Sequence, residues 1–318
     1  GQGSQRDKEM KAGLVAILGR PNVGKSTLLN RLVGTKISIT AAKPQTTRDA
    51  IQGIVTRPEG QIVFVDSPGI HEPRQELGRR MMREVQRAAS GCELALVLVD
   101  GSQSPGRGDA AAIETARNLS VPLLLGLNKI DLLQSKQVLL PRIARYNTTQ
   151  AFEEFIPLSA HSGENIDLLL RLIFDRLPEA VPFYPDDYIT DQPEKFLASE
   201  FIREKVIEET HQEVPHSVAV IVDQWEQKAP RSTPRKQDLQ GLLRVSATVY
   251  VERVGQKKIL VGSRGAMLKK VGSAAREELE TWFGSRVFLE LFVKVRPNWR
   301  GQPSFVKALD FHRMLGES

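Results

Sequence analysis

The segment Gly19–Thr27 has the residue types and spacing of a loop that binds the phosphates of a nucleotide. It reads GRPNVGKST and fits the pattern G-x-x-x-x-G-K-S/T at every fixed position. Glycines in such a loop let successive backbone N–H groups point inward, and the following helix start adds partial positive charge. Lys25 can reach the β- and γ-phosphates, and the Ser26 hydroxyl can hold Mg²⁺. We assign phosphate binding to Gly19, Asn22, Val23, Gly24, Lys25, Ser26 and Thr27.

Two further motifs suit the metal ion and the γ-phosphate. Asp66-Ser67-Pro68-Gly69 follows the strand pattern 61–65, so Asp66 would bind Mg²⁺ through water and the Gly69 N–H would sense the γ-phosphate. A threonine of the pair Thr46-Thr47 would complete the Mg²⁺ ligands with Ser26 and Asp66. Thr47 is favoured because it directly precedes Arg48 and can swing inward, although the sequence does not separate the two. Lys25, Thr47 and Gly69 are the candidate catalytic residues.

Another pair of motifs suits guanine. In Asn128-Lys129-Ile130-Asp131, the Asp131 carboxylate can accept from both the ring N1–H and the 2-amino group, a pair of donors that adenine lacks. Asn128 would brace the loop and reach purine N7, and the stem of Lys129 would cover the base plane. In the companion segment Ser159–Gly163, the backbone N–H of Ala160 could meet guanine O6, and Ser159 begins that loop. Together the motifs predict a site for GTP or GDP.

These motifs need strands to position them, and the strand patterns are present. Apolar runs typical of buried strands occur at 13–18, 51–57, 61–65, 94–99, 121–127 and 154–158, with helical patterns between them. That alternation predicts a doubly wound α/β domain with a mostly parallel sheet. A proline-rich stretch at 178–185 then predicts a linker.

The second half of the chain has a motif of its own. We expect a helix at 200–210, strands at 217–225 and 242–252, a helix at 273–283 and a strand at 286–295. Gly262-Ser263-Arg264-Gly265 has the G-x-x-G form of the KH loop, which clamps the backbone of single-stranded RNA. The alternative is a glycine-rich helix cap. Six cations and no acid in residues 253–270 favour RNA, and we assign its binding to Lys257, Lys258, Gly262, Ser263, Arg264, Gly265, Lys269 and Lys270.

Composition agrees with two domains and an anionic partner. The 318 residues suffice for two cores, and the single cysteine excludes a disulfide framework. No apolar run approaches the ~18 residues of a membrane span. The net charge of +6 is uneven, with 23 Lys and Arg against 22 Asp and Glu over residues 1–193, and 21 against 16 over 194–318. A basic second half favours an anionic partner.

Taken together, the motifs resemble those of the Era group of GTPases. That group carries GRPNVGKST, here Gly19–Thr27, and KPQTTR in its first switch, here Lys43–Arg48. Its DTPG reads DSPG here, a small departure at Ser67, which need not contact nucleotide. Its N-K-x-D and S-A-x-x-G are Asn128–Asp131 and Ser159–Gly163, and the likeness continues to about Trp299.

The resemblance implies a small-GTPase P-loop domain followed by an α+β type II KH domain. We divide the chain into a disordered or cloning-derived start (1–10), a GTPase domain (11–177), a linker (178–198) and a KH-like domain with a C-terminal extension (199–318). It further implies a cytoplasmic monomer, partly peripheral to the inner face of the cell membrane (or in an organelle stroma or matrix), that binds the 3′ end of 16S ribosomal RNA on the 30S subunit and acts in small-subunit maturation.

Two residues carry further expectations. Many GTPases orient the attacking water with a glutamine after the D-x-x-G glycine, but Ile70 stands there, so hydrolysis should be slow or use another group. The resemblance implies that Asn22 helps to bind K⁺ near the β- and γ-phosphates; the alternative is that it only braces the loop.

Two other kinds of protein are alternatives to this interpretation. A regulatory GTPase could use its KH-like domain to bind a protein, although the uneven charge argues against it. A tRNA-modifying enzyme that shares the GTPase domain would need a catalytic cysteine or flavin-site glycines, and residues 178–318 contain no cysteine.

Overall fold

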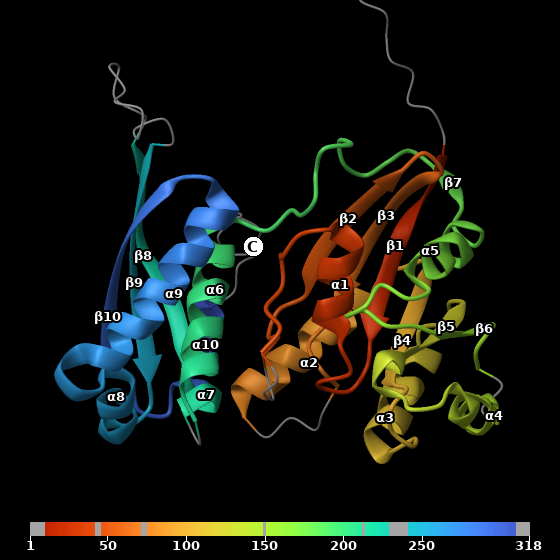
Figure 1. Ribbon diagram of the computed structural model, residues 1–318, viewed down its shortest axis with the longest axis horizontal. Coiled ribbons are helices and arrows are strands. Elements are labelled where there is room, and N and C mark those ends of the chain that lie inside the picture. The colour runs from red at the N-terminus through yellow and green to blue at the C-terminus, as the bar shows by residue number, and fades with distance from the viewer. Residues whose placement is uncertain are drawn as a thin grey trace, which may run out of the picture. The chain divides into compact units, whose positions relative to one another are not determined.

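The computed structural model describes residues 10–41, 46–70, 75–148, 151–211, 214–228 and 241–309. The chain divides into two compact units, each with its own sheet (Figure 1). Of the described residues, the first unit holds those up to Thr40, 47–70 and 78–191. The second holds Ala41, Thr46, 75–77 and the residues from Gln192 onward.

The first unit is a doubly wound α/β fold, which confirms the predicted fold class. Its strand order is β2-β3-β1-β4-β5-β6, and β7 pairs with β1. Strand β2 is antiparallel to β3 and β7 is antiparallel to β1, whereas the other neighbours pair in parallel. The strands are β1 (Met10–Leu18), β2 (Ile51–Arg57), β3 (Gly60–Asp66), β4 (Leu94–Asp100), β5 (Leu123–Asn128), β6 (Glu154–Pro157) and β7 (Glu179–Ala180).

Helices cover both faces of this sheet. One hydrophobic cluster joins side chains of α2, α3 and α4 to one face of β1, β4 and β5. Helix α1 packs against β2 and β3 (Figure 1). Strands β4 and β5 are buried along their whole length, as expected for a parallel sheet covered on both faces. The helices are α1 (Lys25–Val33), α2 (Glu76–Ala89), α3 (Arg107–Arg117), α4 (Leu139–Asn147) and α5 (Ile166–Phe174), with short 3-10 turns at Ile130–Leu132 and Lys136–Val138.

The topology brings the sequence motifs together. Because β1, β3 and β5 run in the same direction, their carboxyl ends lie at one edge of the sheet. The motifs at Gly19, Asp66 and Asn128 stand at those three ends. Ligands of open α/β sheets bind at this edge, outside the carboxyl ends of the strands.

The segment after α5 is held along the edge strand β2. Ile54 donates its backbone N–H to the carbonyl oxygen of Ile189 at 2.9 Å. The Gln61 side chain donates to the carbonyl of Tyr184 at 2.8 Å and accepts its N–H at 2.9 Å. The first part of the predicted linker is therefore hydrogen-bonded to the first unit.

The second unit has a three-stranded sheet in the order β10-β9-β8 (Figure 1). Strand β10 is parallel to β9, and β8 is antiparallel to it. Helix α6 packs on β8, α9 packs on β10, and the two helices pack together. The elements are α6 (Glu194–Glu209), α7 (Val214–Ser217), β8 (Ala219–Lys228), β9 (Leu242–Val251), α8 (Val254–Val261), a 3-10 turn (Ser263–Gly265), α9 (Ala266–Phe283), β10 (Arg286–Val295), a 3-10 turn (Trp299–Gly301) and α10 (Pro303–Ala308).

Two helices are longer than the sequence predicted. Helix α9 starts at Ala266 rather than at Ser273, because Gly272, a residue that disfavours helix interiors, is accommodated inside it. Helix α6 starts at Glu194 rather than at Glu200. Trp299 is fully buried and donates its Nε1–H to the Ser217 carbonyl at 2.7 Å, so it belongs to the core.

Some predictions fall on residues that the structure does not describe. These are the N-terminal segment before Met10, the switch residues Lys43, Pro44 and Gln45, and the C-terminal extension after Leu309. Within the described ranges, no helix combines the length and apolar character that crossing a membrane requires.

Candidate nucleotide and RNA sites

The phosphate-binding motif forms the turn between β1 and α1. Asn22 and Gly24 have φ values of 64° and 100°, the left-handed backbone that lets neighbouring N–H groups converge. A Cβ on Gly24 would stand 2.2 Å from Asn128 Nδ2, and one on Gly19 would stand 2.6 Å from the Leu98 carbonyl oxygen. Close approach by neighbouring groups therefore requires glycine at both positions.

The Lys25 side chain folds back over this loop and is buried. Its Nζ donates to the carbonyl oxygens of Gly19 at 3.1 Å and Arg20 at 3.0 Å. Burial lowers the pKa of Lys25 to about 8, while the nearby Asp66 carboxylate opposes that shift. The ammonium group thus lies inside the loop that would hold the phosphates.

The oxygen donors assigned to Mg²⁺ lie together. Ser26 Oγ donates to Asp66 Oδ2 at 2.7 Å and lies 2.9 Å from Thr47 Oγ1. Thr46 instead donates its hydroxyl to the Ala41 carbonyl at 2.8 Å, so the structure brings Thr47, as favoured, to Ser26.

Asp66 has the environment expected of a metal ligand. It is fully buried, and burial raises its pKa to about 6 against the opposing effects of Lys25 and of hydrogen bonds from Ser26 and Ser38. Its Oδ1 has no hydrogen-bond partner among the described residues. Hydroxyl and carboxylate oxygens suit Mg²⁺. No group of three or more His, Cys, Asp or Glu that could hold a metal occurs in the described parts.

Asn128 connects the base motif to the phosphate loop. Its Nδ2 donates to the Val23 carbonyl at 2.9 Å, and its Oδ1 accepts the Ala160 N–H at 2.9 Å. The bracing role expected of Asn128 is therefore present. The Ala160 N–H, which we assigned to guanine O6, is bonded to Asn128 here.

The neighbouring residues of the base motif are also fixed. Lys129 donates through Nζ to the Asn22 carbonyl at 2.7 Å and to Asp100 Oδ2 at 3.0 Å. Ser159 donates its hydroxyl to Asp131 Oδ1 at 2.6 Å. The carboxylate that would read guanine is therefore oriented by the companion loop.

Two arginines near these loops were missed by the sequence analysis. Arg31, in the last turn of α1, donates Nε–H to the Ala160 carbonyl at 3.0 Å and Nη2–H to the His161 carbonyl. Arg20 donates Nε–H to Asp109 of α3 at 2.9 Å. Arg20 lies inside the phosphate motif and Arg31 lies four residues after it. Because a basic residue at either position is equally consistent with a solvated surface, the sequence offered no specific signal for these contacts.

The segment after Asp66 packs against the phosphate loop. A Cβ on Gly69 would stand 2.7 Å from Pro21, and Ile70 donates its N–H to the Gly19 carbonyl at 3.1 Å. The Ile70 side chain is buried in the cluster between the sheet and α2 to α4. Ser67 donates its hydroxyl to the Ile17 carbonyl at 2.9 Å, a structural role that agrees with the harmless departure inferred there.

The G-x-x-G motif of the second unit joins α8 to α9. Gly262, Arg264 and Gly265 all have positive φ, at 73°, 52° and 79°. A Cβ on Gly262 would meet the Met267 backbone nitrogen at 2.8 Å, whereas one on Gly265 would meet nothing within 4 Å. The loop therefore exposes backbone at the start of a long helix, where phosphate binds readily.

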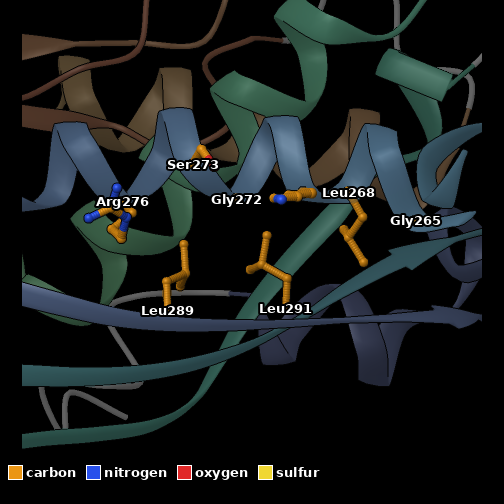
Figure 2. Close-up of a pocket in the computed structure, with 8 residues that line it drawn as sticks. Gly265, Leu268, Gly272, Ser273, Arg276, Leu289 and Leu291 are labelled. Atoms are coloured by element: carbon orange, nitrogen blue, oxygen red, sulfur yellow. The ribbon is translucent and has the colours of Figure 1, made fainter.

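A groove of about 330 Å³ runs from this loop along α9 (Figure 2). Leu289 and Leu291 of β10 form one wall, and one face of α9 forms the other. The lining residues are Gly265, Leu268, Lys269, Gly272, Ser273, Arg276, Leu289 and Leu291.

Only part of the predicted RNA set lines this groove. Gly265 and Lys269 do, and the apolar Leu268 lines it beside them. Lys270 forms an ion pair with Glu209 at 2.5 Å instead. The sequence analysis did not assign Gly272, Ser273 and Arg276 of α9 to this groove. They lie seven, eight and eleven residues after Gly265, which is the spacing of one helix face, so a predicted helix that began at Ala266 would have placed them together.

Comparisons with known proteins identify a family for each half of the chain. Residues 14–129 match the family model described as "50S ribosome-binding GTPase", and residues 213–300 match the KH domain model. The chain is 45% identical to the GTPase Era of Geobacter metallireducens over 305 residues, covering 96% of this chain and 99% of that protein. It is 43% identical to the GTPase Era of Staphylococcus haemolyticus over 303 residues, covering 95% and 98%.

Two solved structures are also similar over nearly the full chain. One is a tyrosine-to-alanine variant of Aquifex aeolicus Era bound to GDP and AlF4⁻, and the other is Era in complex with MgGDPNP and nucleotides 1506–1542 of 16S ribosomal RNA. Each has a TM-score of 0.88 and 38% identity, and the match covers 95% of this chain and 99% of the other. With its nucleotide motifs at one sheet edge and a KH fold following them, this chain belongs to the Era family of GTPases.

Proposed function

We propose that this protein is a slowly hydrolysing GTP switch that binds the 3′-end region of 16S ribosomal RNA and acts in small-subunit biogenesis. The observation that carries the proposal is the meeting of Ser26, Thr47 and Asp66 oxygens beside the Lys25 ammonium. The similar Era structure that contains MgGDPNP and 16S nucleotides supports both halves of it.

In the nucleotide site, each group has a distinct part. The loop N–H groups and Lys25 would hold the phosphates, Ser26, Thr47 and Asp66 would hold Mg²⁺, and Gly69 would sense the γ-phosphate. Mg²⁺ would supply neutralisation of charge on the β- and γ-phosphate oxygens. The guanine would be bound by Asn128, Lys129, Asp131, Ser159 and Ala160. The phosphate loop would be completed by Gly19, Asn22, Val23, Gly24 and Thr27.

Slow hydrolysis follows from Ile70. Its side chain is buried in the core of the first unit, so it can neither donate to nor accept from an attacking water. We propose that K⁺ at Asn22 offsets part of the charge that develops between the β- and γ-phosphates. The Asn22 amide makes no hydrogen bond within the described residues, which leaves it available for such an ion.

RNA binding is assigned to the second unit. The G-x-x-G loop, with Lys257, Lys258, Gly262, Ser263, Arg264 and Gly265, would clamp the RNA backbone, as such loops do in KH domains. Lys269, at the groove rim, and Lys270 would add charge. In this proposal, residues 11–177 form the GTPase domain, residues 178–198 form the linker and residues 199–318 form the KH-like domain.

The test is binding of the full chain to a labelled RNA with the 3′-terminal sequence of 16S ribosomal RNA and to the same sequence reversed, from low to high salt. We expect tighter binding to the native sequence and a steep loss of affinity with salt, because phosphate contacts release counterions. Equal or absent binding of both RNAs would favour the other candidate, a GTPase whose KH-like domain binds a protein.

The proposal also covers the location and the assembly state of the protein. We propose a monomer in the cytoplasm (or an organelle stroma or matrix) that is partly associated with the inner membrane face, on the strength of the family motifs alone. Light scattering of the purified chain and co-flotation with anionic vesicles test the two statements separately.

A further inference from the structure

The groove along α9 has a built polar end at Arg276, opposite the G-x-x-G loop. Gly265 stands at one end of the groove, and Arg276 stands at the other, beside Leu289 (Figure 2). The loop end suits backbone phosphates, which carry no sequence information. Gly265 and Arg276 are eleven residues apart, about 16 Å along the helix axis, so a residue at the far end would meet the base of a nucleotide further along the strand.

Arg276 forms an ion pair with a carboxylate that also accepts a hydrogen bond from the sheet. Glu280, one turn later on α9, accepts the backbone N–H of Val287 at 3.0 Å, at the start of β10. Its two carboxylate oxygens lie 3.3 and 3.5 Å from Arg276 Nη1. This i,i+4 ion pair is solvent-exposed, with 44% of the Arg276 side chain and 32% of the Glu280 side chain accessible, and it engages the Nη1 group of the guanidinium.

The Nε–H and Nη2–H donors of Arg276 lie side by side, and we call this pair the Arg276 fork. Within the described residues, its hydrogen bonds all run from Nη1 to Glu280. The Nε–H and Nη2–H groups, two parallel donors in one plane, remain available. Two parallel donors of this kind bind best to a partner that offers two adjacent hydrogen-bond acceptors.

The groove between the loop and Arg276 suits a flat ring. Its floor is apolar, from Leu268, Leu289 and Leu291. Position 272 carries no side chain, and a Cβ there would already be 3.6 Å from Leu291. Leu291 therefore packs close to the helix backbone at Gly272, and a base would lie over these apolar side chains with its edge toward Ser273 and Arg276.

We infer that Arg276 is the base-selecting residue of this groove, and that it selects a base with two adjacent hydrogen-bond acceptors: guanine at O6 and N7, or cytosine at O2 and N3. Adenine and uracil place a donor next to each acceptor, so one N–H of the fork would face another N–H. This inference rests on the proposed RNA-binding function and deepens it.

The test uses the full chain and four fluorescently labelled RNA decamers at one salt concentration: oligocytidine, alternating guanosine and uridine, oligoadenosine and oligouridine. We expect the parent to bind the cytidine decamer, the guanosine-containing one, or both at least about fivefold more tightly than the other two, the discrimination typical of one bidentate pair. Which of the two is preferred identifies the base.

Arg276→Gln should abolish that preference and leave the affinities for oligoadenosine and oligouridine within about twofold of the parent, because only base pairing with the fork is lost. Arg276→Lys, which keeps the charge without the fork, should lose the preference too. Lys269→Gln is the matched contrast and should weaken all four decamers alike, as a phosphate contact does. An unchanged thermal unfolding transition of the second unit confirms that each variant is folded.

Three results would overturn the inference. They are a parent with no preference, an Arg276→Gln variant that keeps the preference, and an Arg276→Gln variant that weakens all four decamers equally, which would make Arg276 a phosphate contact. If the parent binds none of the decamers even at low salt, the proposed RNA-binding function fails, and this inference fails with it.

Discussion

The side-chain Oδ1 of Asn128 accepts the backbone N–H of Ala160 at 2.9 Å, and this bond joins the two loops assigned to the base. The other end of the same amide donates to the Val23 carbonyl of the phosphate loop at 2.9 Å. Asn128 is 2% exposed, so water cannot replace either partner. One buried amide therefore fixes the base loop relative to the phosphate loop.

Asn128→Ala should weaken both folding and nucleotide binding. It leaves the Val23 carbonyl and the Ala160 N–H unpaired, at about 1–3 kcal/mol for each buried group. Asn128→Asp retains the acceptor for Ala160 but loses the donor to Val23, so it should be intermediate. Thermal unfolding and GDP affinity measure the two effects, and a variant with parental values in both would show that the bracing is dispensable.

Arg31→Ala should speed nucleotide release. Arg31 holds the Ala160 and His161 carbonyls, and without it the base loop loses its tie to α1. Two hydrogen bonds from a charged donor at a partly exposed site correspond to roughly tenfold in GDP affinity. Arg171→Ala, on the exposed face of α5, is the control and should release GDP at the parental rate. Equal rates for the two variants would mean that Arg31 is merely a surface residue.

Asp131→Asn should switch preference from guanine toward xanthine nucleotides. The amide replaces two acceptors by one donor and one acceptor, which suits the additional carbonyl of xanthine. Ser159, which donates to Oδ1, can still orient the new side chain. Competition of GTP and XTP against a fluorescent GDP analogue measures the switch. A variant that binds GTP as tightly as the parent would remove Asp131 from base recognition.

Gly265→Asp should abolish RNA binding and leave GTP binding intact. A carboxylate at the helix start opposes phosphate by charge, and Gly265 has open space for a side chain; its φ of 79° strains any substitution, but Asp and Asn adopt such values more readily than other residues. Gly265→Asn has the same shape without the charge and should retain most of the affinity. The double change of Gly262 and Gly265 to Asp is a harsher version, because Gly262 also has Met267 against it. Full RNA affinity in folded Gly265→Asp would refute the KH clamp.

GTP hydrolysis should be clearly faster in KCl than in NaCl at equal ionic strength. Sodium is smaller than potassium and fits poorly into a shell built for the larger ion. Asn22→Ala should remove most of the difference while GDP affinity changes little. Single-turnover phosphate release in the two salts is the measurement. Equal rates in both salts, with Asn22→Ala as fast as the parent, would reduce Asn22 to a loop residue.

The sequence by itself determined the nucleotide site of this protein. The spacing from Gly19 to Ser26 dictates a strand, a tight turn and a helix start, so local chemistry alone predicts that Lys25 and Ser26 would meet a phosphate. Asp66 and Asn128 follow buried strands, and the rule that parallel strands end at one edge brought them to the same place. The G-x-x-G pattern and the cations around it predicted the KH loop at Gly262–Gly265, with a glycine-rich helix cap as the alternative.

Only the tertiary structure decided the contacts made across the fold. Arg31 reaches Ala160, 129 residues away, and nothing in the helix pattern of α1 marks it. Thr47 rather than Thr46 meets Ser26, because the path of the chain, and not residue type, selects between two identical neighbours. The groove at Arg276 exists because Gly272 stays inside α9, where packing against β10 outweighs the helix propensity of one glycine. Long-range packing energy is absent from local patterns, so these features required the folded chain.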